Sequence, residues 1–466
     1  MHVPTDHRPP SLSLDPFASP DHVDPCLQQF LHQASDLLCA WLGEASAGSP
    51  LPMVRPQPVI APAQKGSDAE GLLKDLQTVM DGAFQPSHPG ALAHLDPPPL
   101  TSSLAAELIC AGLNNNLLAE ELSPGLSSLE QQLCGWFCTR LGLPDSSGGV
   151  LASGGTLSNL MALVVARTAA DVETGVILCS RDAHVSLEKS ARVMGLPPES
   201  LCQLPVDASG CLCLSSLQQA IDDLRTRHQR CIAVVATAGT TVRGAIDPLH
   251  AIASICRRES IWLHVDAAIG GVFALSADTA PLLDGLNRAD SITLNPQKLL
   301  GITKASSLLL LRDRSLLKTA FSTGLPYMES PSGESHGGEI GLQGTRPAEV
   351  LKLWLGLRQL GEQGIVAVLD GALERRRTLE HLLGSDQLLL LGGSLHLLAC
   401  RPRGADDRET ERWSQTTRQS LLKDGFLLSR PRYEGHHWLK AVLGNPHTNI
   451  AALEQLADRV LASLNA

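Results

Sequence analysis

The feature that most constrains the fold is an alternation of short apolar runs and helix-length segments between residues 148 and 312. The apolar runs lie at residues 175–178, 231–237, 261–265, 291–294 and 306–311. The helix-length segments lie at residues 157–170, 186–194, 214–228 and 248–259. Strands that alternate with helices form parallel sheets, because a parallel crossover needs a dozen or more residues. We therefore predict an α/β domain in which helices wrap a mostly parallel sheet.

The chain on either side of this region shows other patterns. Apolar side chains at helical spacing predict N-terminal helices over residues 26–43 and 71–84. Residues 1–25 contain prolines and charges and are expected to be poorly ordered. Further helices are expected at residues 102–118, which include Asn114, Asn115 and Asn116, and at residues 127–141 and 346–360. Residues 318–345 lack periodicity and predict a long loop.

The C-terminal hundred residues predict a smaller α+β domain. The expected elements are helices at 365–383, at 414–422 and from Asn449 onward, and strands near 388–391 and 395–400. We divide the chain into an N-terminal helical segment (1–95), a large α/β domain (96–360) and a small C-terminal domain (361–466).

Charge and cysteine spacing narrow the class of protein. A formal net charge of −11 disfavours nucleic acid and anionic membranes as partners. The twelve cysteines lack metal-site spacing, so we expect no metal centre and reduced thiols in a cytoplasmic protein. The N-terminus has no apolar core of a signal peptide, and no apolar run reaches the length of a membrane span.

Two glycines and a threonine mark a candidate anion site in S-G-G-T-L-S-N-L, residues 153–160. Gly154 and Gly155 let the backbone approach an anion, and Thr156 offers a hydroxyl group beside the free N–H groups of a new helix. A glycine turn followed by threonine also begins many ordinary helices, so the motif alone leaves both interpretations open.

Asp266 ends a predicted strand in W-L-H-V-D-A-A-I-G-G, residues 262–271. A buried carboxylate needs a cationic partner, and a protonated ring nitrogen would serve. Ala267 and Ala268 leave flat space beside it. A helix-capping or salt-bridged aspartate is one alternative. An Asp–His metal pair is another, although no further ligand cluster supports it.

Other polar side chains follow further predicted strands. Thr240 and Thr241 follow the run at 231–237, and His184 follows the run at 175–178 and opens a helix. A single histidine is more often structural, yet an imidazole can stack on a planar ligand. Ligands of such sheets bind at the carboxyl ends of the strands, which is where these residues are expected.

Lys298 follows the strand at 291–294, behind an Asn-Pro turn. A lysine in a turn is usually a surface residue, whereas a desolvated amine can form a Schiff base with an aldehyde. The combined motifs supply a phosphate-binding turn, a stacking histidine, hydroxyl groups, an aspartate and a lysine. Pyridoxal phosphate presents the matching groups, namely a phosphate, a flat ring, a ring nitrogen and a carbonyl.

From about His88 to its C-terminus, the chain resembles the group II pyridoxal-phosphate-dependent amino-acid decarboxylases. The matching stretches are H-P-x-x-x-A-H (88–94), S-P-G-L-S-S-L-E (123–130), S-G-G-T-L-S-N-L, D-A-H-V-S-L-E-K-S, T-A-G-T-T-x-x-G-A-x-D, H-V-D-A-A, D-S-x-x-x-N-P-Q-K and R-P-A-E-V-L-K-L-W (346–354). The resemblance implies fold type I of the pyridoxal-phosphate-dependent transferases, with a mostly parallel seven-stranded sheet. It also implies a homodimer with shared active sites.

The resemblance implies a role for each matching residue. Lys298 would form the Schiff base with the cofactor, Asp266 would pair with the pyridine nitrogen, and His184 and Ala268 would cover the two faces of the ring. The predicted cofactor-binding residues are Gly155, Thr156, His184, Thr241, Asp266, Ala268, Asn295 and Lys298. The predicted substrate-binding residues are His94, Asn115 and Arg346, with Arg346 pairing with the substrate carboxylate.

Two residues, Tyr327 and Gln297, bear on proton transfer in the expected reaction. Tyr327 resembles the tyrosine that these enzymes place on a mobile loop, where it would donate a proton to Cα after carbon dioxide leaves. Relatives with oxidative chemistry have another residue there, so Tyr327 favours simple decarboxylation. The family usually has histidine before the lysine, but this chain has Gln297, which cannot transfer a proton at neutral pH. Tyr327 or His336 would then handle more of that proton transfer.

The expected reaction is decarboxylation of an L-amino acid to an amine and carbon dioxide. Aromatic side chains are only 3% of the chain, which weakens an aromatic substrate. The polar side chains at His94 and in the asparagine run favour glutamate, aspartate, cysteine sulfinate or 2,4-diaminobutyrate. The alternatives are an aromatic amino-acid decarboxylase, an oxidative deaminase, and a non-catalytic homologue that only binds the cofactor.

Overall fold

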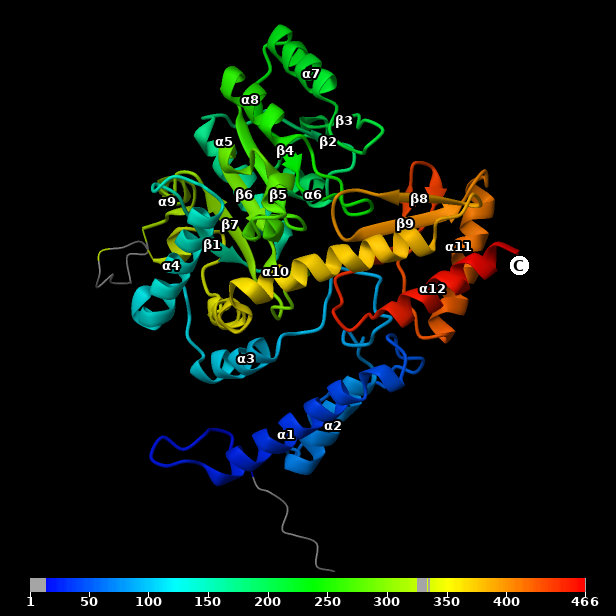
Figure 1. The fold of residues 1–466 in the computed structure, drawn as a ribbon. Coiled ribbons are helices and arrows are strands. Elements are labelled where there is room, and N and C mark those ends of the chain that lie inside the picture. Colours follow the sequence, from blue (N-terminus) through cyan, green and yellow to red (C-terminus); the bar gives the residue numbers. More distant parts are fainter. Residues whose placement is uncertain (1–13, 325–332, 334–335, 466) are drawn as a thin grey trace, which may run out of the picture.

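A computed structural model of the 466-residue chain describes residues 14–324, 333 and 336–465. Figure 1 shows a large lobe around a central sheet, a small C-terminal lobe and a pair of N-terminal helices that lies apart from both. Within the described residues, no helix has both the length and the apolar character needed to cross a membrane.

The large lobe is built on a seven-stranded sheet of order β1-β7-β6-β5-β4-β2-β3. Its strands are β1 (Gly148–Ala152), β2 (Val176–Ser180), β3 (Leu201–Leu204), β4 (Cys231–Thr237), β5 (Trp262–Ala267), β6 (Ser291–Leu294) and β7 (Ser307–Leu311). Six strands point the same way, and β7 is antiparallel to both of its neighbours. The predicted mostly parallel α/β fold is therefore confirmed. The four-residue β3 was missed, because its L-C-Q-L sequence lacks β-branched side chains.

Helices cover both faces of this sheet, as a parallel sheet requires. They are α4 (Pro124–Arg140), α5 (Gly155–Ala169), α6 (Ser186–Val193), α7 (Leu214–Thr226), α8 (Leu249–Glu259) and α9 (Ser315–Phe321). Side chains alternate between the faces along each strand. In β2, Ile177 and Cys179 join the apolar cluster that includes side chains of α5 and α6, whereas Leu178 joins the larger core that includes α4, α7 and α8.

The parallel strands end at one edge of the sheet. The loops that leave β1, β2, β4, β5 and β6 there contain residues 153–156, 181–184, 238–241, 268–271 and 295–298. The motifs predicted to bind the cofactor therefore occupy neighbouring loops, although they are up to 143 residues apart in the sequence.

The small lobe has its own antiparallel sheet of order β12-β9-β8. Its elements are β8 (Leu388–Gly392), β9 (Leu397–Pro402), α11 (Asp407–Lys423), β10 (Arg432–Tyr433), β11 (His436–His437), β12 (Leu439–Val442) and α12 (Ile450–Ala462). Helix α11 begins seven residues before the predicted start. Asp406 and Glu409 form a capping box that fixes this beginning. The first turn is mostly charged, so it lacks the apolar pattern on which the prediction was based.

The two lobes are joined by α10 (Val350–Leu382), the long yellow helix in Figure 1. Gly361 interrupts it with φ 59° and ψ −177°, a conformation that essentially only glycine adopts. The predicted helices at 346–360 and 365–383 are thus the two arms of one interrupted helix. The first arm begins at Val350 rather than at Arg346.

The N-terminal helices are α1 (Pro25–Gly43), α2 (Ala69–Asp81) and α3 (Thr101–Leu113). Helices α1 and α2 agree with the predicted ranges and lie side by side (Figure 1). The prediction that α3 continues to residue 118 is wrong. Asn114 adopts a left-handed conformation with φ 46° and ends the helix, so Asn115 and Asn116 lie in the following loop.

Residues 318–345 are less irregular at their ends than predicted. Helix α9 extends to Phe321, and Glu339 joins the two ends of the segment by accepting hydrogen bonds from the backbone N–H groups of Thr323 and Gly324. Burial would raise the pKa of the Glu339 carboxyl, but these bonds and one from the Ser322 hydroxyl lower the pKa to about 2. Tyr327 lies outside the described residues.

Candidate active site

A cavity of about 240 Å³ lies at the carboxyl edge of the large sheet. It is lined by Gly155, Thr156, Asn159, His184, Thr237, Gly239, Thr240, Thr241, Asp266, Ala268, Ile269, Asn295, Gln297 and Lys298. The structure brings all eight predicted cofactor-binding residues to this cavity. The predicted substrate-binding residues His94, Asn115 and Arg346 are not among its lining residues.

Lys298 stands at the end of a 3₁₀ turn, Pro296–Lys298, directly after β6. The proline fixes the first residue of this turn, and the Lys298 N–H donates to the carbonyl oxygen of Asn295. Burial lowers the pKa of the Lys298 amine, while the charges of Asp266 and Asp96 act in the opposite direction. A larger unprotonated fraction makes this amine a better nucleophile toward a carbonyl group.

Gln297 stands where the family usually has histidine. Its side chain forms hydrogen bonds that connect this turn to the start of β7. Its Oε1 accepts a hydrogen bond from the Ser306 N–H at 2.6 Å, and its Nε2 donates to the Ser307 hydroxyl at 3.4 Å. The side chain thus closes the loop between Lys298 and β7, a structural contribution that needs no proton transfer.

Asp266 presents a buried carboxylate on the same edge. Its Oδ1 accepts from the Ala268 N–H at 3.2 Å, and its Oδ2 accepts from Asn159 Nδ2 at 2.8 Å. It forms no ion pair among the residues that the structure describes. A buried carboxylate with free electron pairs facing a cavity fits a cationic ligand group such as a pyridinium N–H.

The described residues give no support for the alternative in which Asp266 and a histidine bind a metal ion. Both ring nitrogens of His264 are engaged, Nδ1 with the Ser291 hydroxyl and Nε2 with Asn159 Oδ1. The described part of the chain contains no group of three or more His, Cys, Asp or Glu side chains that could hold a metal ion.

The opposite end of the cavity fits an anion. Gly155 and Thr156 begin α5, whose first N–H groups are free to bind a phosphate. A Cβ atom on Gly155 would lie 2.9 Å from Asn295 Nδ2, so a larger residue there would require the Asn295 side chain to shift. Asn295 Oδ1 is buried and has no hydrogen-bond partner among the described residues. This oxygen needs a hydrogen-bond donor, whereas the Nδ2 group of the same side chain can donate to an anion.

His184 lies across the cavity on the loop after β2. The Ser186 N–H donates to its Nδ1 at 3.2 Å, which orients the ring. Desolvation lowers the pKa of His184, the charge of Asp266 opposes this shift, and the charge of Lys298 reinforces it. A neutral ring suits stacking on a planar ligand. The small lobe steadies this loop, because the Tyr433 hydroxyl donates to Asp182 Oδ2 at 2.5 Å.

Lys440 is a candidate functional residue that the sequence analysis missed. It comes from β12 of the small lobe, is only 5% exposed, and donates from Nζ to the carbonyl oxygen of Thr241 at 3.1 Å. Burial, followed by the charge of Lys298, lowers the pKa of Lys440 to about 8. The available signal was a lysine inside the apolar run W-L-K-A-V-L, residues 438–443.

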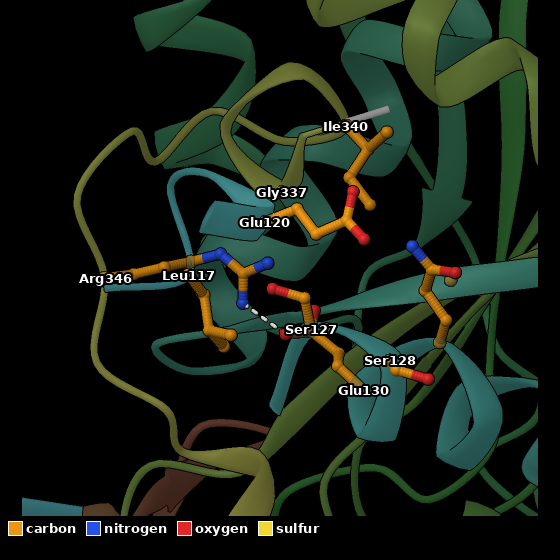
Figure 2. Close-up of a pocket in the computed structure, with 10 residues that line it drawn as sticks. Leu117, Glu120, Ser127, Ser128, Glu130, Gly337, Ile340 and Arg346 are labelled. Carbon is orange, nitrogen blue, oxygen red and sulfur yellow. Dashed lines mark hydrogen bonds and ion pairs between the residues drawn. The ribbon is translucent and has the colours of Figure 1, made fainter. Parts of the chain in front are cut away.

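Arg346 lies in a second, smaller cavity of about 150 Å³ (Figure 2). Figure 2 shows its guanidinium group pointing at Glu130, and Nη1 lies 2.6 Å from Glu130 Oε2. The other oxygen of Glu130 accepts from the Leu151 N–H on β1. The charge of Arg346 is therefore balanced inside its own chain. Asn115 donates to the carbonyl oxygen of Leu113 at the end of α3.

The remaining predicted residues lie elsewhere. His94 is exposed in the single chain. His336 is buried, and its Nδ1 accepts from the Glu120 N–H at 3.4 Å.

A buried lysine, a carboxylate and an anion-binding helix start at one edge of a parallel sheet define the class of pyridoxal-phosphate enzymes. The model of the family "Pyridoxal-dependent decarboxylase conserved domain" matches residues 50–389. The chain belongs to this family. It is a pyridoxal-phosphate-dependent amino-acid decarboxylase, and hence a carboxy-lyase.

Relatives with different substrates match at similar levels. The aromatic-L-amino-acid decarboxylase of Bacillus atrophaeus is 31% identical over 69% of this chain and 68% of its own. The L-2,4-diaminobutyrate decarboxylase of Rhizobium meliloti is 30% identical over 82% of this chain and 79% of its own. The crystal structure of mouse CSAD in apo form has a TM-score of 0.86 at 26% identity, covering 94% of this chain and 99% of that one.

Loss of Glu130 should destabilise the large lobe. Glu130→Ala leaves Arg346 buried without its counter-charge, so we expect the free energy of unfolding to fall by about 3–5 kcal/mol, measured by urea denaturation. Glu188→Ala is the matched control, because the Arg192–Glu188 pair is exposed and is worth about 0.5 kcal/mol or less. Equal effects of the two variants would contradict the structural role of Glu130 and favour an Arg346 available to substrate.

Proposed function

We propose that this enzyme decarboxylates a small polar L-amino acid, such as glutamate, aspartate, cysteine sulfinate or 2,4-diaminobutyrate. The observation that supports the site most directly is the position of Lys298 and Asp266 in one cavity, with Gly155, Thr156 and Asn295 at its anion-binding end. Bound pyridoxal phosphate supplies a sink for the electron pair that remains on Cα when carbon dioxide leaves.

The side chains of the cavity divide the work of holding and polarising the cofactor. The Lys298 amine would hold the aldehyde group of the cofactor, and its lowered pKa favours the unprotonated form that this attachment needs. Asp266 would pair with the protonated ring nitrogen. His184 and Ala268 would cover the two ring faces, and Thr241 would lie close to the cofactor. Selective loss of carbon dioxide would require the chain to hold the substrate carboxylate perpendicular to the ring.

Lys440 is the side chain best suited to hold a substrate carboxylate. It is a buried ammonium group, and among the described residues it pairs with no carboxylate. It also contacts the Thr241 backbone at the cavity wall. Arg346 was predicted for this role, but Glu130 already neutralises it. The substrate-binding roles of His94 and Asn115 and the proton-donor role of Tyr327 stay predictions.

We also propose a homodimer, because large apolar side chains of the N-terminal helices are uncovered. Helix α1 has no buried residue in the single chain. Large apolar side chains that are at least one-third exposed on α1, α2 and α3 are Leu31, Leu72, Leu76, Val79, Leu108, Ile109 and Leu113. A second copy of the chain would cover these apolar side chains.

The homodimer predicts a particle mass of about twice 49.5 kDa by sedimentation equilibrium. Ile109→Glu, at a position 54% exposed on α3, should shift the chain toward the monomer, because it places a charge in an apolar interface. Val193→Glu on α6 is the control, at a position 64% exposed on the large lobe. A wild-type protein that sediments at the monomer mass would refute the dimer.

We further propose a cytoplasmic location and the three-part division into residues 1–95, 96–360 and 361–466. All twelve cysteines are free in the structure, as a reducing compartment favours. Residues 90–92 hydrogen-bond to Leu427 and Val442 of the small lobe, so the end of the first segment packs on the third.

The decisive experiment is an amino-acid panel scored for carbon dioxide release. We expect release from one small polar amino acid and a loss of about 10⁴-fold or more in Lys298→Ala, because the amine that attaches to the cofactor is absent. Lys189→Ala, on the exposed side of α6, is the control. Full activity in Lys298→Ala would exclude the proposed site. Oxygen uptake with an aldehyde product would favour the oxidative alternative.

The Lys440 assignment predicts a pH dependence of substrate binding. Lys440 is protonated below its pKa of about 8, so its hold on a substrate carboxylate is present there and is lost as the pH rises. Lys440→Arg stays charged at higher pH, so the ratio of wild-type KM to variant KM should increase above pH 8. Lys440→Met should raise KM about 10- to 100-fold below pH 8. A constant KM ratio from pH 7 to 10 would contradict this assignment.

A further inference from the structure

A buried row of polar side chains connects β6 to the carboxylate of Asp266. It consists of Trp262, Ser291, His264 and Asn159, which we call the donor chain. Trp262 Nε1 donates to the Ser291 hydroxyl oxygen at 2.9 Å, and that oxygen lies 2.9 Å from His264 Nδ1. His264 Nε2 lies 3.1 Å from Asn159 Oδ1. Asn159 Nδ2 then donates to Asp266 Oδ2 at 2.8 Å.

Hydrogen-bonding chemistry gives these contacts one direction. Asp266, as a carboxylate, only accepts, so Asn159 turns its amide protons toward Asp266 and its Oδ1 toward His264. His264 Nε2 must then carry a proton and donate it to Asn159 Oδ1, which leaves Nδ1 of a neutral imidazole as an acceptor. Ser291 therefore donates its hydroxyl proton to Nδ1, while its oxygen accepts from the indole N–H of Trp262. Every contact in the row is satisfied by this arrangement.

The imidazole in the middle of the row is neutral, as this arrangement requires. His264 has no exposed surface, and burial lowers its pKa to about 4, although the charge of Asp266 acts in the opposite direction. A charged imidazolium would donate from both nitrogens and reverse the bond to Ser291. A neutral His264 has one donor and one acceptor nitrogen, as this row of hydrogen bonds requires.

We infer that the donor chain is a positioning device that keeps the shared proton on the cofactor's ring nitrogen rather than on Asp266. The inference rests on the proposed cofactor site. Donors that converge on a carboxylate pair with its oxygen atoms and stabilise its negative charge. The network also fixes the carboxylate in place, because Asn159 Nδ2 additionally donates to the Ser186 hydroxyl at 2.9 Å.

The β5–β6 register offers a matched control. It pairs His264 with Ser291 and Asp266 with Thr293, so Ser291 and Thr293 are alternate residues of one strand. Thr293 Oγ1 donates to the Ser158 hydroxyl, which donates to the carbonyl oxygen of Leu308. This second row is equally buried but ends on backbone, so breaking it leaves the bonds to Asp266 intact.

The test uses the full chain loaded with pyridoxal phosphate labelled with nitrogen-15 in the ring. Ser291→Ala should move the ring-nitrogen resonance toward the unprotonated position, and cofactor affinity should fall about tenfold. His264→Phe should act in the same direction. Ser291→Thr, which keeps the hydroxyl, should restore the wild-type resonance. Thr293→Val should leave both the resonance and the affinity unchanged.

The outcomes distinguish a failure of the donor-chain inference from a failure of the proposed cofactor site. A wild-type resonance in Ser291→Ala, or an equal shift in Thr293→Val, would overturn the inference while leaving the proposed function intact. A wild-type protein that binds no pyridoxal phosphate would refute the proposed site. If His264→Phe fails to fold, the comparison of Ser291→Ala with Ser291→Thr decides the result.

Discussion

The structure depends on one constraint, which is that the ends of five parallel strands meet at one edge of a sheet. Each of these strands is buried on both faces, so a polar residue inside it needs a buried hydrogen-bond partner, whereas the strand ends can present polar groups to a ligand. The loops there supply the Lys298 amine, the Asp266 carboxylate and the Gly155 turn. A sheet with another strand order would disperse the same loops, because the cavity is formed by neighbouring strands and not by neighbouring sequence.

The small lobe completes this edge from outside the sheet. Lys440 reaches the carbonyl oxygen of Thr241, and Tyr433 holds Asp182 on the loop that contains His184. These contacts come from β12 and β10, which follow the last strand of the large sheet by more than a hundred residues. The lobe therefore contacts loops of the site through individual side chains, while α10 connects the two lobes (Figure 1).

Much of this arrangement could be predicted from the sequence, for identifiable reasons. Asp266 follows an apolar run directly and Lys298 follows one after an Asn-Pro-Gln turn, so the strand pattern places both near strand ends. The end of α3 at Asn114 could not be predicted in this way. The left-handed backbone conformation of Asn114 ends the helix, and the spacing of apolar side chains does not show it. The partnership of Arg346 with Glu130 and the approach of Lys440 depend on long-range packing, on which a single sequence gives little information.

The reversed direction of β7 has a consequence for the turnover of the enzyme. Because β7 begins at the edge where its neighbours end, the chain that leaves Lys298 returns to the same edge within ten residues. Gln297 fastens this short return to Ser306 and Ser307. The backbone of Lys298 is thus tethered on both sides, which would keep its amine beside the cavity even when a substrate amine has replaced it on the cofactor. The antiparallel return of β7 would in this way favour retention of the cofactor from one reaction to the next.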